Sequence, residues 1–167
     1  TRISEVIAKL GLDQGILRKV SREGNVESKQ TAILSALKMG SISGLIFMLI
    51  QIALAGFLAE DIFNQSSLLT KVIAIHAFSL PFYIIIHISA FSTQAFKLLK
   101  YKIVVTEIQN PLILLLAMIV CYFFYSAESA IIIPVVLSAV LGCITITIFL
   151  KKVSGINILS VNKGIFN

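Results

Sequence analysis

Four long runs of this sequence contain no Asp, Glu, Lys or Arg, and they cover residues 39–59, 72–96, 108–127 and 129–150. Each run has 20 to 25 residues, enough for an α-helix to cross the roughly 30 Å hydrocarbon core of a bilayer. In lipid such a run must be helical, because a helix satisfies its own backbone N–H and C=O groups. One charged side chain at the middle of a span costs about 2.5–3.5 kcal/mol. The runs therefore predict an all-α chain, a transmembrane helix bundle with four spans.

The composition of the chain fits lipid better than water as its surroundings. Of the 167 residues, 57% are hydrophobic and 13% are charged, and the mean hydropathy is +0.97. A soluble domain carries about 25% charged residues. The net charge is +6, but the basic residues flank the apolar runs, and no nucleic-acid-binding motif is present. We therefore expect the lipid bilayer, and no nucleic acid, as a partner.

The basic residues fall on one side of the predicted membrane. Thirteen of the fourteen lie before the first run, between the second and third, or after the fourth: Arg2, Lys9, Arg18, Lys19, Arg22, Lys29, Lys38, Lys97, Lys100, Lys102, Lys151, Lys152 and Lys163. Lys71 alone lies on the other side. The positive-inside rule places the side rich in Lys and Arg in the cytoplasm. We expect a multi-pass protein of the cytoplasmic (inner) membrane with both ends of this chain cytoplasmic.

The runs divide the chain into three regions. We expect the cytoplasmic end of a preceding span with an amphipathic loop, then the spanning region, then a cytoplasmic tail. These regions cover residues 1–38, 39–153 and 154–167, and the spans cover about 39–59, 72–96, 103–127 and 129–150. Thr31 is a candidate N-cap for the first helix, and the short link around Glu128 makes the last two spans a hairpin. The chain opens on Thr1 without an initiator Met, which indicates a piece of a longer protein.

A polar stripe marks the second predicted span. His76, Tyr83, His87 and Gln94 are 7, 4 and 7 residues apart, so they share one face of a helix. Polar side chains inside a membrane face a bundle interior or a water-filled path. The stripe is either a cavity wall that touches a polar substrate or a set of interhelical hydrogen bonds. We expect no metal site, because three helical turns separate the two histidines.

Single polar residues mark the first and third spans. Gln51 lies at mid-membrane, and Glu107, Gln109 and Asn110 cluster at the start of the third charge-free run. Each is a candidate to hydrogen-bond with a sugar or with a neighbouring helix.

Small residues recur every four positions on the first and fourth spans, which is typical of close helix packing; they are Ala32, Ala36, Gly40, Gly44, Ser138 and Gly142. Pro81, Pro111 and Pro134 are expected to kink the helices that contain them.

The sequence contains no set of residues typical of an enzyme. All eight acidic residues lie outside the four charge-free runs, and no glycine-rich phosphate loop is present. Cys121 and Cys143 lie inside apolar runs without metal-ligand spacing. We expect a protein that is not an enzyme and has no cofactor or metal.

Several segments, taken in order, resemble the oligosaccharide flippase family of polysaccharide-biosynthesis membrane proteins, which belongs to a superfamily with multidrug exporters. The segments are GLDQGILR at 11–18, VSR at 20–22, ILSALK at 33–38, FSLPF at 78–82, AFKLLKYK at 95–102 and QNP at 109–111. The resemblance extends to about Val153. One link departs from the family pattern, because the chain has FKLL at 96–99 where the family tends to have Arg-Gly-Leu-Gly.

The resemblance implies that the four spans are spans three to six of a transporter with twelve to fourteen, and that the remaining spans are partners. It implies an undecaprenyl-pyrophosphate-linked oligosaccharide as the substrate. Its sugar headgroup needs replacement hydrogen bonds inside the bundle, for which we expect His87, Gln94, Tyr83 and Gln51. The pyrophosphate needs a cation. Arg18 is our candidate, with Asp13 orienting it or closing a gate, although Arg18 is equally an ordinary positive-inside residue.

Two other functions remain open. A multidrug or cation exporter of the same superfamily would need a carboxylate inside the bundle, and the charge-free runs contain none. A membrane scaffold without transport activity would need no polar stripe on the second span.

Overall fold

The computed structural model describes residues 6–7, 11–62, 67–124 and 127–155, and within these ranges it has helices and no strands. Four of its helical segments are long and apolar enough to cross a membrane, and they cover Val26–Ala53, Leu68–Ala95, Leu99–Phe124 and Ala130–Ser154. The predicted all-α bundle with four spans is therefore confirmed.

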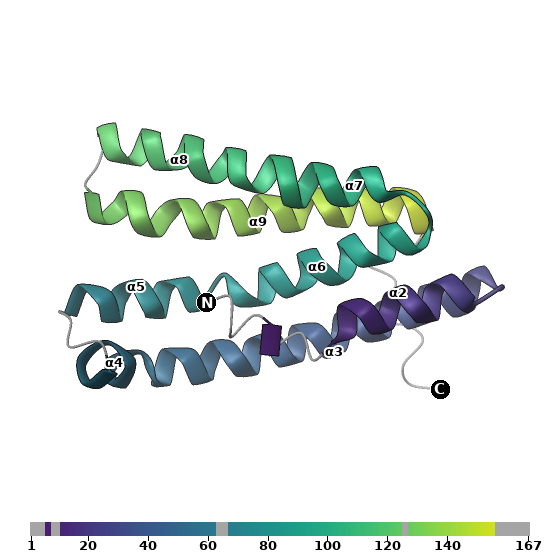
Figure 1. Ribbon diagram of the computed structural model, residues 1–167, viewed down its shortest axis with the longest axis horizontal. Helices are drawn as coiled ribbons and strands as arrows, with labels where there is room; N and C mark the ends of the chain where they lie inside the picture. The colour runs from purple at the N-terminus through teal and green to yellow at the C-terminus, as the bar shows by residue number, and fades with distance from the viewer. Residues whose placement is uncertain (1–5, 8–10, 63–66, 125–126, 156–167) are drawn as a thin grey trace.

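The long helices lie side by side along one direction (Figure 1). In chain order the elements are α2 (Leu12–Arg22), α3 (Val26–Ala53), α4 (Ala55–Phe57), η1 (Leu58–Ile62), α5 (Ser67–Ala77), α6 (Leu80–Ala95), α7 (Leu99–Ile103), η2 (Val104–Gln109), α8 (Asn110–Phe124) and α9 (Ala127–Ser154). Helices α8 and α9 form the expected hairpin, and α6 packs against α3 on one side and α9 on the other. The short helix α2 packs on α3 and α6.

The first span begins earlier than the sequence indicated. Asn25 is the N-cap of α3, and its side-chain oxygen accepts a hydrogen bond from the Glu27 N–H at 3.1 Å. The prediction of Thr31 as N-cap is wrong, because its hydroxyl donates to the Glu27 carbonyl at 3.0 Å from inside the helix. Hydropathy marks the apolar part of this helix only. The polar turns before it are helical as well, and the Asn25 side chain satisfies one of their free N–H groups.

The small residues pack helices together, as expected. A Cβ atom on Gly40 or Gly44 would collide with α6, in particular with Ile84, Ile88 and the backbone of Pro81. On α9 a Cβ atom on Gly142 would collide with the side chain of Asn110. The absence of side chains at these positions lets the helices approach closely.

The second span is broken near its middle. Helix α5 ends at Ala77 and α6 begins at Leu80, with Pro81 in its first turn. Pro81 has no N–H to continue the helical ladder, so the two residues between the helices bond locally. The Phe78 N–H donates to the Ile75 carbonyl at 3.1 Å, and the Ser79 hydroxyl donates to the His76 carbonyl at 2.6 Å. Pro134, in contrast, lies inside α9 without ending it.

The third span contains a π-helical segment, η2, which ends two residues before Pro111. The Asn110 N–H bonds five residues back, to the Val105 carbonyl, and Pro111 has no N–H to offer. Such π segments occur often at functional sites.

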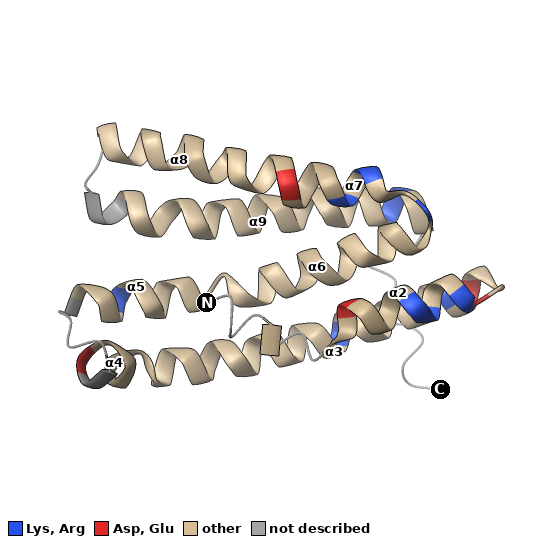
Figure 2. Cartoon of the chain, in the orientation of Figure 1, with Lys and Arg blue, Asp and Glu red and all other residues tan. Residues whose placement is uncertain are grey.

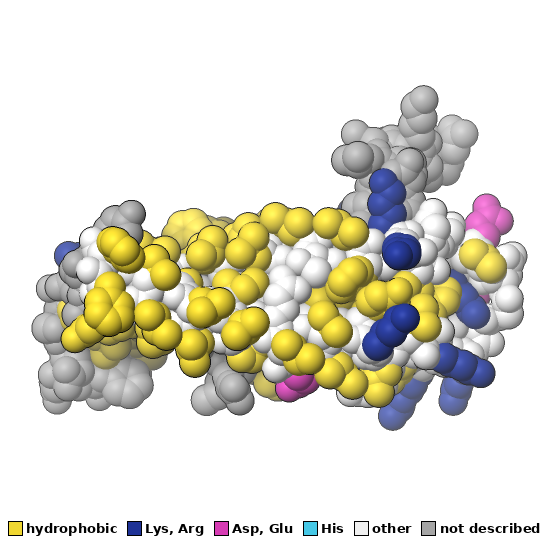
Figure 3. Space-filling model, turned by 90° about the horizontal axis from the view of Figure 1, so that it is seen from above, with side chains coloured by type: hydrophobic (Ala, Val, Ile, Leu, Met, Phe, Trp, Pro, Cys, Tyr) yellow, Lys and Arg dark blue, Asp and Glu magenta, His cyan; other side chains and the backbone are white. Residues whose placement is uncertain are grey.

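Charge separates along the bundle (Figure 2). Lys and Arg gather at the end formed by α2, the start of α3, α7 and the end of α9, which we call the basic end. Lys71 on α5 and Glu60 in η1 lie at the opposite end. Figure 3 shows hydrophobic side chains along most of one face, with dark blue side chains at the basic end. A long apolar surface with cations at one end is typical of a membrane-spanning bundle.

Candidate functional site

A cavity of about 720 Å³ lies where α5 and α6 face η2 and α8. Its polar lining consists of His76, Ser79, Tyr83, His87, Thr106, Glu107 and Asn110. Apolar side chains complete it, including Val135 of α9 and Val6 near the start of the chain. A cavity of this size is within the range of small-molecule sites.

The structure brings three members of the polar stripe to this cavity. His76, Tyr83 and His87 all line it, because the break before Pro81 leaves them on the same side of α5 and α6. Gln94 does not line it. Its side-chain oxygen accepts a hydrogen bond from the Lys102 ammonium at 3.0 Å, and that ammonium also lies 3.8 Å from the centre of the Phe91 ring. The prediction of a cavity wall thus fits three residues, and the interhelical alternative fits Gln94.

Local hydrogen bonds orient His76. Its Nδ1 atom lies 2.9 Å from the Val72 carbonyl, four residues back on α5. A carbonyl only accepts, so this contact requires the proton on Nδ1. The other ring nitrogen then remains to interact with a ligand in the cavity.

Glu107 lies outside the third charge-free run but inside the third span, which the sequence placed at about 103–127. The charge-free run begins at residue 108, but the spanning helix begins at Leu99. Glu107 therefore lies eight residues inside the span, about 12 Å along a helix that rises 1.5 Å per residue. It is the red segment between the labels α7 and α8 in Figure 2. The expectation that the bundle contains no carboxylate is wrong.

Thr106 lies beside this carboxylate. Its hydroxyl is 3.1 Å from Oε1 of Glu107 and 2.9 Å from the Lys102 carbonyl. A hydroxyl has one proton to donate, so at any moment Thr106 donates to only one of these two oxygens.

The other polar residues of the third span divide between the two expected roles. Gln109 donates to the Thr145 hydroxyl at 2.8 Å, which ties η2 to α9. Asn110 lines the cavity, but its Oδ1 atom is buried and receives no hydrogen bond from any described residue. A buried acceptor without a donor is costly, and this oxygen packs against Gly142 of α9.

Gln51 lies away from the cavity. The residue is buried on α3, and within the described part of the chain nothing donates to its Oε1 atom. Its predicted role in substrate binding is therefore not supported by its position among the lining residues.

Arg18 and Asp13 lie on α2, also away from the cavity. Arg18 is exposed, and Asp13 accepts a hydrogen bond from the adjacent Gln14 N–H at 2.8 Å. No ion pair or hydrogen bond joins Arg18 to Asp13 among the residues with described positions. The expected orienting contact is absent there.

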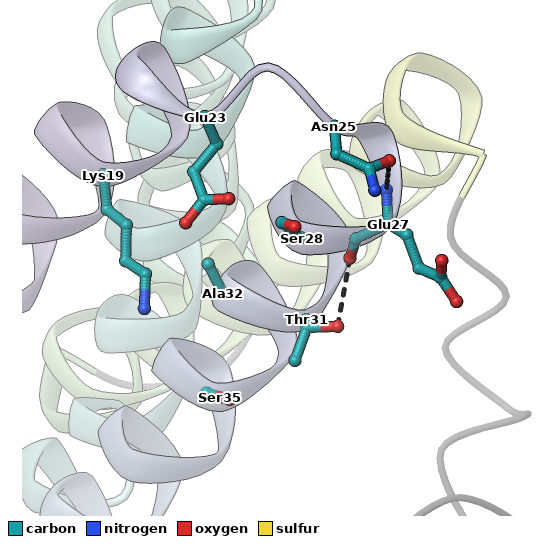
Figure 4. Close-up of a pocket in the computed structure, with 8 residues that line it drawn as sticks. All are labelled: Lys19, Glu23, Asn25, Glu27, Ser28, Thr31, Ala32 and Ser35. Atoms are coloured by element: carbon teal, nitrogen blue, oxygen red, sulfur yellow. Dashed lines mark hydrogen bonds between the residues drawn. The ribbon is translucent and has the colours of Figure 1, made fainter.

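A second, shallower pocket of about 400 Å³ lies at the junction of α2 and α3. Figure 4 shows Lys19 and Glu23 reaching toward it from α2, opposite Thr31 and Ser35 on α3. These side chains are polar and lie at the basic end, where water is available. The pocket forms where the two helices diverge after the turn at Asn25, and it shares no residues with the larger cavity.

The larger cavity offers hydrogen bonds and one negative charge. Among its described lining residues there is one carboxylate and no Lys or Arg. No group of three or more His, Cys, Asp or Glu side chains within the described ranges could hold a metal ion. The site fits an uncharged ligand with many hydroxyls or a cation, and it disfavours a bound phosphate, whose charge would repel Glu107.

The fold and this cavity define a multi-pass α-helical membrane protein with a polar site between its spans. The chain matches no protein-family model, no curated protein and no solved structure.

Proposed function

We propose that this chain is part of a transporter that flips a lipid-linked oligosaccharide across the cytoplasmic membrane. The cavity of about 720 Å³, with its polar wall from α5, α6, η2 and α8, carries this proposal. Polar side chains between spans are expensive and mark pathways for polar substrates.

Hydrogen bonding explains how the cavity would serve a sugar. Sugar hydroxyls cannot enter hydrocarbon without losing their water partners. Tyr83, His87 and Asn110 supply both donors and acceptors at one place. The lipid tail would remain in the bilayer while the headgroup occupies the cavity.

The pyrophosphate would be held elsewhere. The cavity lining has no cation among its described residues, whereas α2 carries Arg18, Lys19 and Arg22 at the basic end. By the positive-inside rule we place this end in the cytoplasm, where the lipid-linked substrate would arrive. Arg18 would then capture the pyrophosphate at the entrance, and the sugar would lie deeper.

The outer faces of the helices expose apolar side chains, which supports the proposal that further spans pack against them. In the span Leu99–Phe124, only 11% of the 18-residue stretch with the highest hydropathy is buried within the described structure. Leu116 and Ile119 of α8 are among its exposed residues. We propose that lipid and further spans cover them, as the resemblance to spans three to six of a flippase implies.

Glu107 favours a second candidate, an exporter of organic cations. A carboxylate inside a bundle is what such an exporter needs to bind its substrate or a coupling ion. The same cavity would then take an organic cation, attracted by Glu107 and by the faces of its aromatic lining.

Vesicles containing the full-length protein separate these candidates. One arm measures the exposure of a fluorescent undecaprenyl-pyrophosphate-linked oligosaccharide to an external lectin, and the other measures the uptake of ethidium. We expect the wild type to expose the oligosaccharide and Tyr83→Phe to slow this step, with the lipid-facing Leu116→Ala variant as the control. Ethidium uptake without flipping would favour the organic-cation exporter over the flippase. The absence of both flipping and ethidium uptake would contradict transport by this cavity.

A further inference from the structure

We propose that the pocket at the junction of α2 and α3 binds the headgroup of phosphatidylethanolamine, a phospholipid with a primary ammonium group, and that its acyl chains lie along α3. The inference goes beyond the proposed function and does not depend on it. It rests on the charges that face this pocket of about 400 Å³ and on the apolar side chains that continue from it along the span.

The pocket presents both signs of charge without pairing them. Lys19 and Glu23 lie four residues apart on one face of α2, and both reach toward the pocket (Figure 4). Glu27 lines it from the first turn of α3. Within the described part of the chain, no ion pair joins either carboxylate to Lys19. Unpaired groups of opposite sign in one pocket favour a ligand that carries both signs itself.

One face of α3 runs from the pocket into the span. Its side chains recur at intervals of three or four residues, and at about 100° per residue they form a single stripe. In chain order this α3 stripe consists of Glu27, Thr31, Ser35, Lys38, Ile42, Ile46 and Leu49. All of these residues are exposed within the described structure. The stripe is polar and charged beside the pocket and apolar beyond Lys38, which is the order of headgroup and acyl chain in a phospholipid.

The apolar part of the α3 stripe is long enough for an acyl chain. Leu49 lies fourteen residues beyond Ser35, or about 21 Å along a helix that rises 1.5 Å per residue. One leaflet contributes about half of the roughly 30 Å hydrocarbon core. Ile42, Ile46 and Leu49 are 50%, 51% and 61% exposed, so an acyl chain can lie against them through the depth of the leaflet.

Two lysines can hold the phosphate of this headgroup. Lys38 lies on the α3 stripe directly before its apolar part, at the depth where a Lys side chain extends toward the headgroups. Lys19 reaches the pocket from α2. The Ser35 hydroxyl also lines the pocket and can donate a further hydrogen bond. Charge-assisted hydrogen bonds of this kind are the strong ones for a phosphate oxygen.

The two glutamates select the ammonium group. The carboxylates of Glu23 and Glu27 accept hydrogen bonds only, and a primary ammonium has three N–H groups to donate. Phosphatidylcholine has a trimethylammonium group without N–H, and phosphatidylglycerol has no cation to place beside the carboxylates. Two lysines and two glutamates also balance the zero net charge of phosphatidylethanolamine. The charges therefore distinguish it from both of these phospholipids.

Native mass spectrometry of the full-length protein tests this selection. Protein freed of lipid in detergent would be supplied with phosphatidylethanolamine, phosphatidylcholine or phosphatidylglycerol with identical acyl chains. We expect phosphatidylethanolamine to bind about tenfold more tightly than either of the others, the usual effect of charge-assisted hydrogen bonds. Equal binding of the three, as for lipid without a specific site, would overturn the inference. Tightest binding of phosphatidylglycerol, as for general attraction to the basic end, would overturn it too.

Glycerophosphoethanolamine, the same headgroup without acyl chains, distinguishes a lipid from a water-soluble ligand. We expect it to bind at least about 100-fold more weakly than the lipid, because it covers none of the apolar α3 stripe. Binding as tight as that of the lipid would overturn the phospholipid as the occupant.

Charge-neutralising variants locate the site. Glu23→Gln should weaken phosphatidylethanolamine binding about tenfold and leave phosphatidylcholine binding within about threefold, because only the first lipid donates to Glu23. Lys19→Gln should weaken both alike, since both have the phosphate. Lys152→Gln at the basic end and Glu60→Gln at the opposite end are matched controls outside the pocket. Losses in the controls as large as in the pocket variants, or equal losses of both lipids in Glu23→Gln, would overturn the assignment.

Discussion

A Cβ atom on Gly44 would lie 2.9 Å from the Cα atom of Pro81, so the backbones of α3 and α6 touch at the break in the second span. The contact is with backbone and not with the tip of a flexible side chain. Any side chain at residue 44 must therefore push the two helices apart, next to the turn that places His76 and Tyr83 on the cavity.

The first prediction concerns this contact. Gly44→Ala should lower the free energy of unfolding by about 1–3 kcal/mol, as expected for overpacking. Gly15→Ala is the matched control, because a Cβ atom there meets nothing within 4 Å, and it should raise helix stability by up to about 1 kcal/mol. Thermal unfolding in detergent measures both. Equal stability changes of the same sign in the two variants would contradict the packing described.

The second prediction concerns the end of α6. Lys97 has a φ angle of 63°, in the left-handed region, and its N–H donates to the Gln94 carbonyl at 2.8 Å. The Leu98 N–H donates to the Thr93 carbonyl at 3.2 Å, which completes a Schellman motif. A residue with a Cβ atom costs about 1–2 kcal/mol in this conformation.

Lys97→Gly should therefore stabilise the protein by about 0.5–1 kcal/mol after the chain-entropy cost of glycine is subtracted. Lys97→Ala keeps the Cβ atom and should change the unfolding free energy by less than about 0.5 kcal/mol. A glycine variant no more stable than the alanine variant would count against the left-handed conformation.

The third prediction tests where the first span begins. Asn25→Ala removes the N-cap of α3 and should cost about 1 kcal/mol. Thr31→Val keeps that cap and should reduce stability less, because the Thr31 hydroxyl only donates to the Glu27 carbonyl of the same helix. Circular dichroism during thermal unfolding compares the two. A larger loss of stability in Thr31→Val than in Asn25→Ala would indicate that the helix begins at Thr31.

The fourth prediction separates the residues of the polar stripe. Tyr83→Phe removes a hydroxyl from the cavity and should reduce transport about 10- to 100-fold, the usual effect of losing one specific hydrogen bond to a substrate. Gln94→Met should leave transport within about threefold, since Gln94 bonds to Lys102 outside the cavity. Initial rates of flipping in vesicles measure both. A Gln94 variant as impaired as the Tyr83 variant would place the path along the whole stripe.

The sequence predicted the spans well because lipid imposes one simple requirement, a long run without charge. The helix ends were predicted less well, because polar residues extend a helix beyond the apolar run that hydropathy detects. Asn25 extends the first span backward in this way. Leu99 does the same for the third, which begins four residues before the expected position 103.

The periodicity predicted His76, Tyr83 and His87 on one helical face and left open whether that face lines a cavity or bonds to a neighbouring helix; in the structure all three line the cavity. Periodicity alone cannot show which neighbour a side chain meets, so Gln94 was grouped with them although Lys102 binds it. Arg18 was proposed from its charge and from the family pattern, and its distance from the cavity depends on how α2 packs. Glu107 was detectable from the sequence, because the expected third span of about 103–127 began before the charge-free run at residue 108.

Water access to the cavity within the spanning region is the central claim, and single-cysteine labelling in membranes tests it most directly. In a Cys121→Ala, Cys143→Ala background, cysteines would replace Tyr83 and Asn110 in the cavity and Leu116 and Ile119 on the exposed face of α8. We predict that a charged, membrane-impermeant thiol reagent, supplied from either side, modifies the two cavity positions and spares the two on α8. Modification of the α8 positions with the cavity positions unreactive would contradict the account.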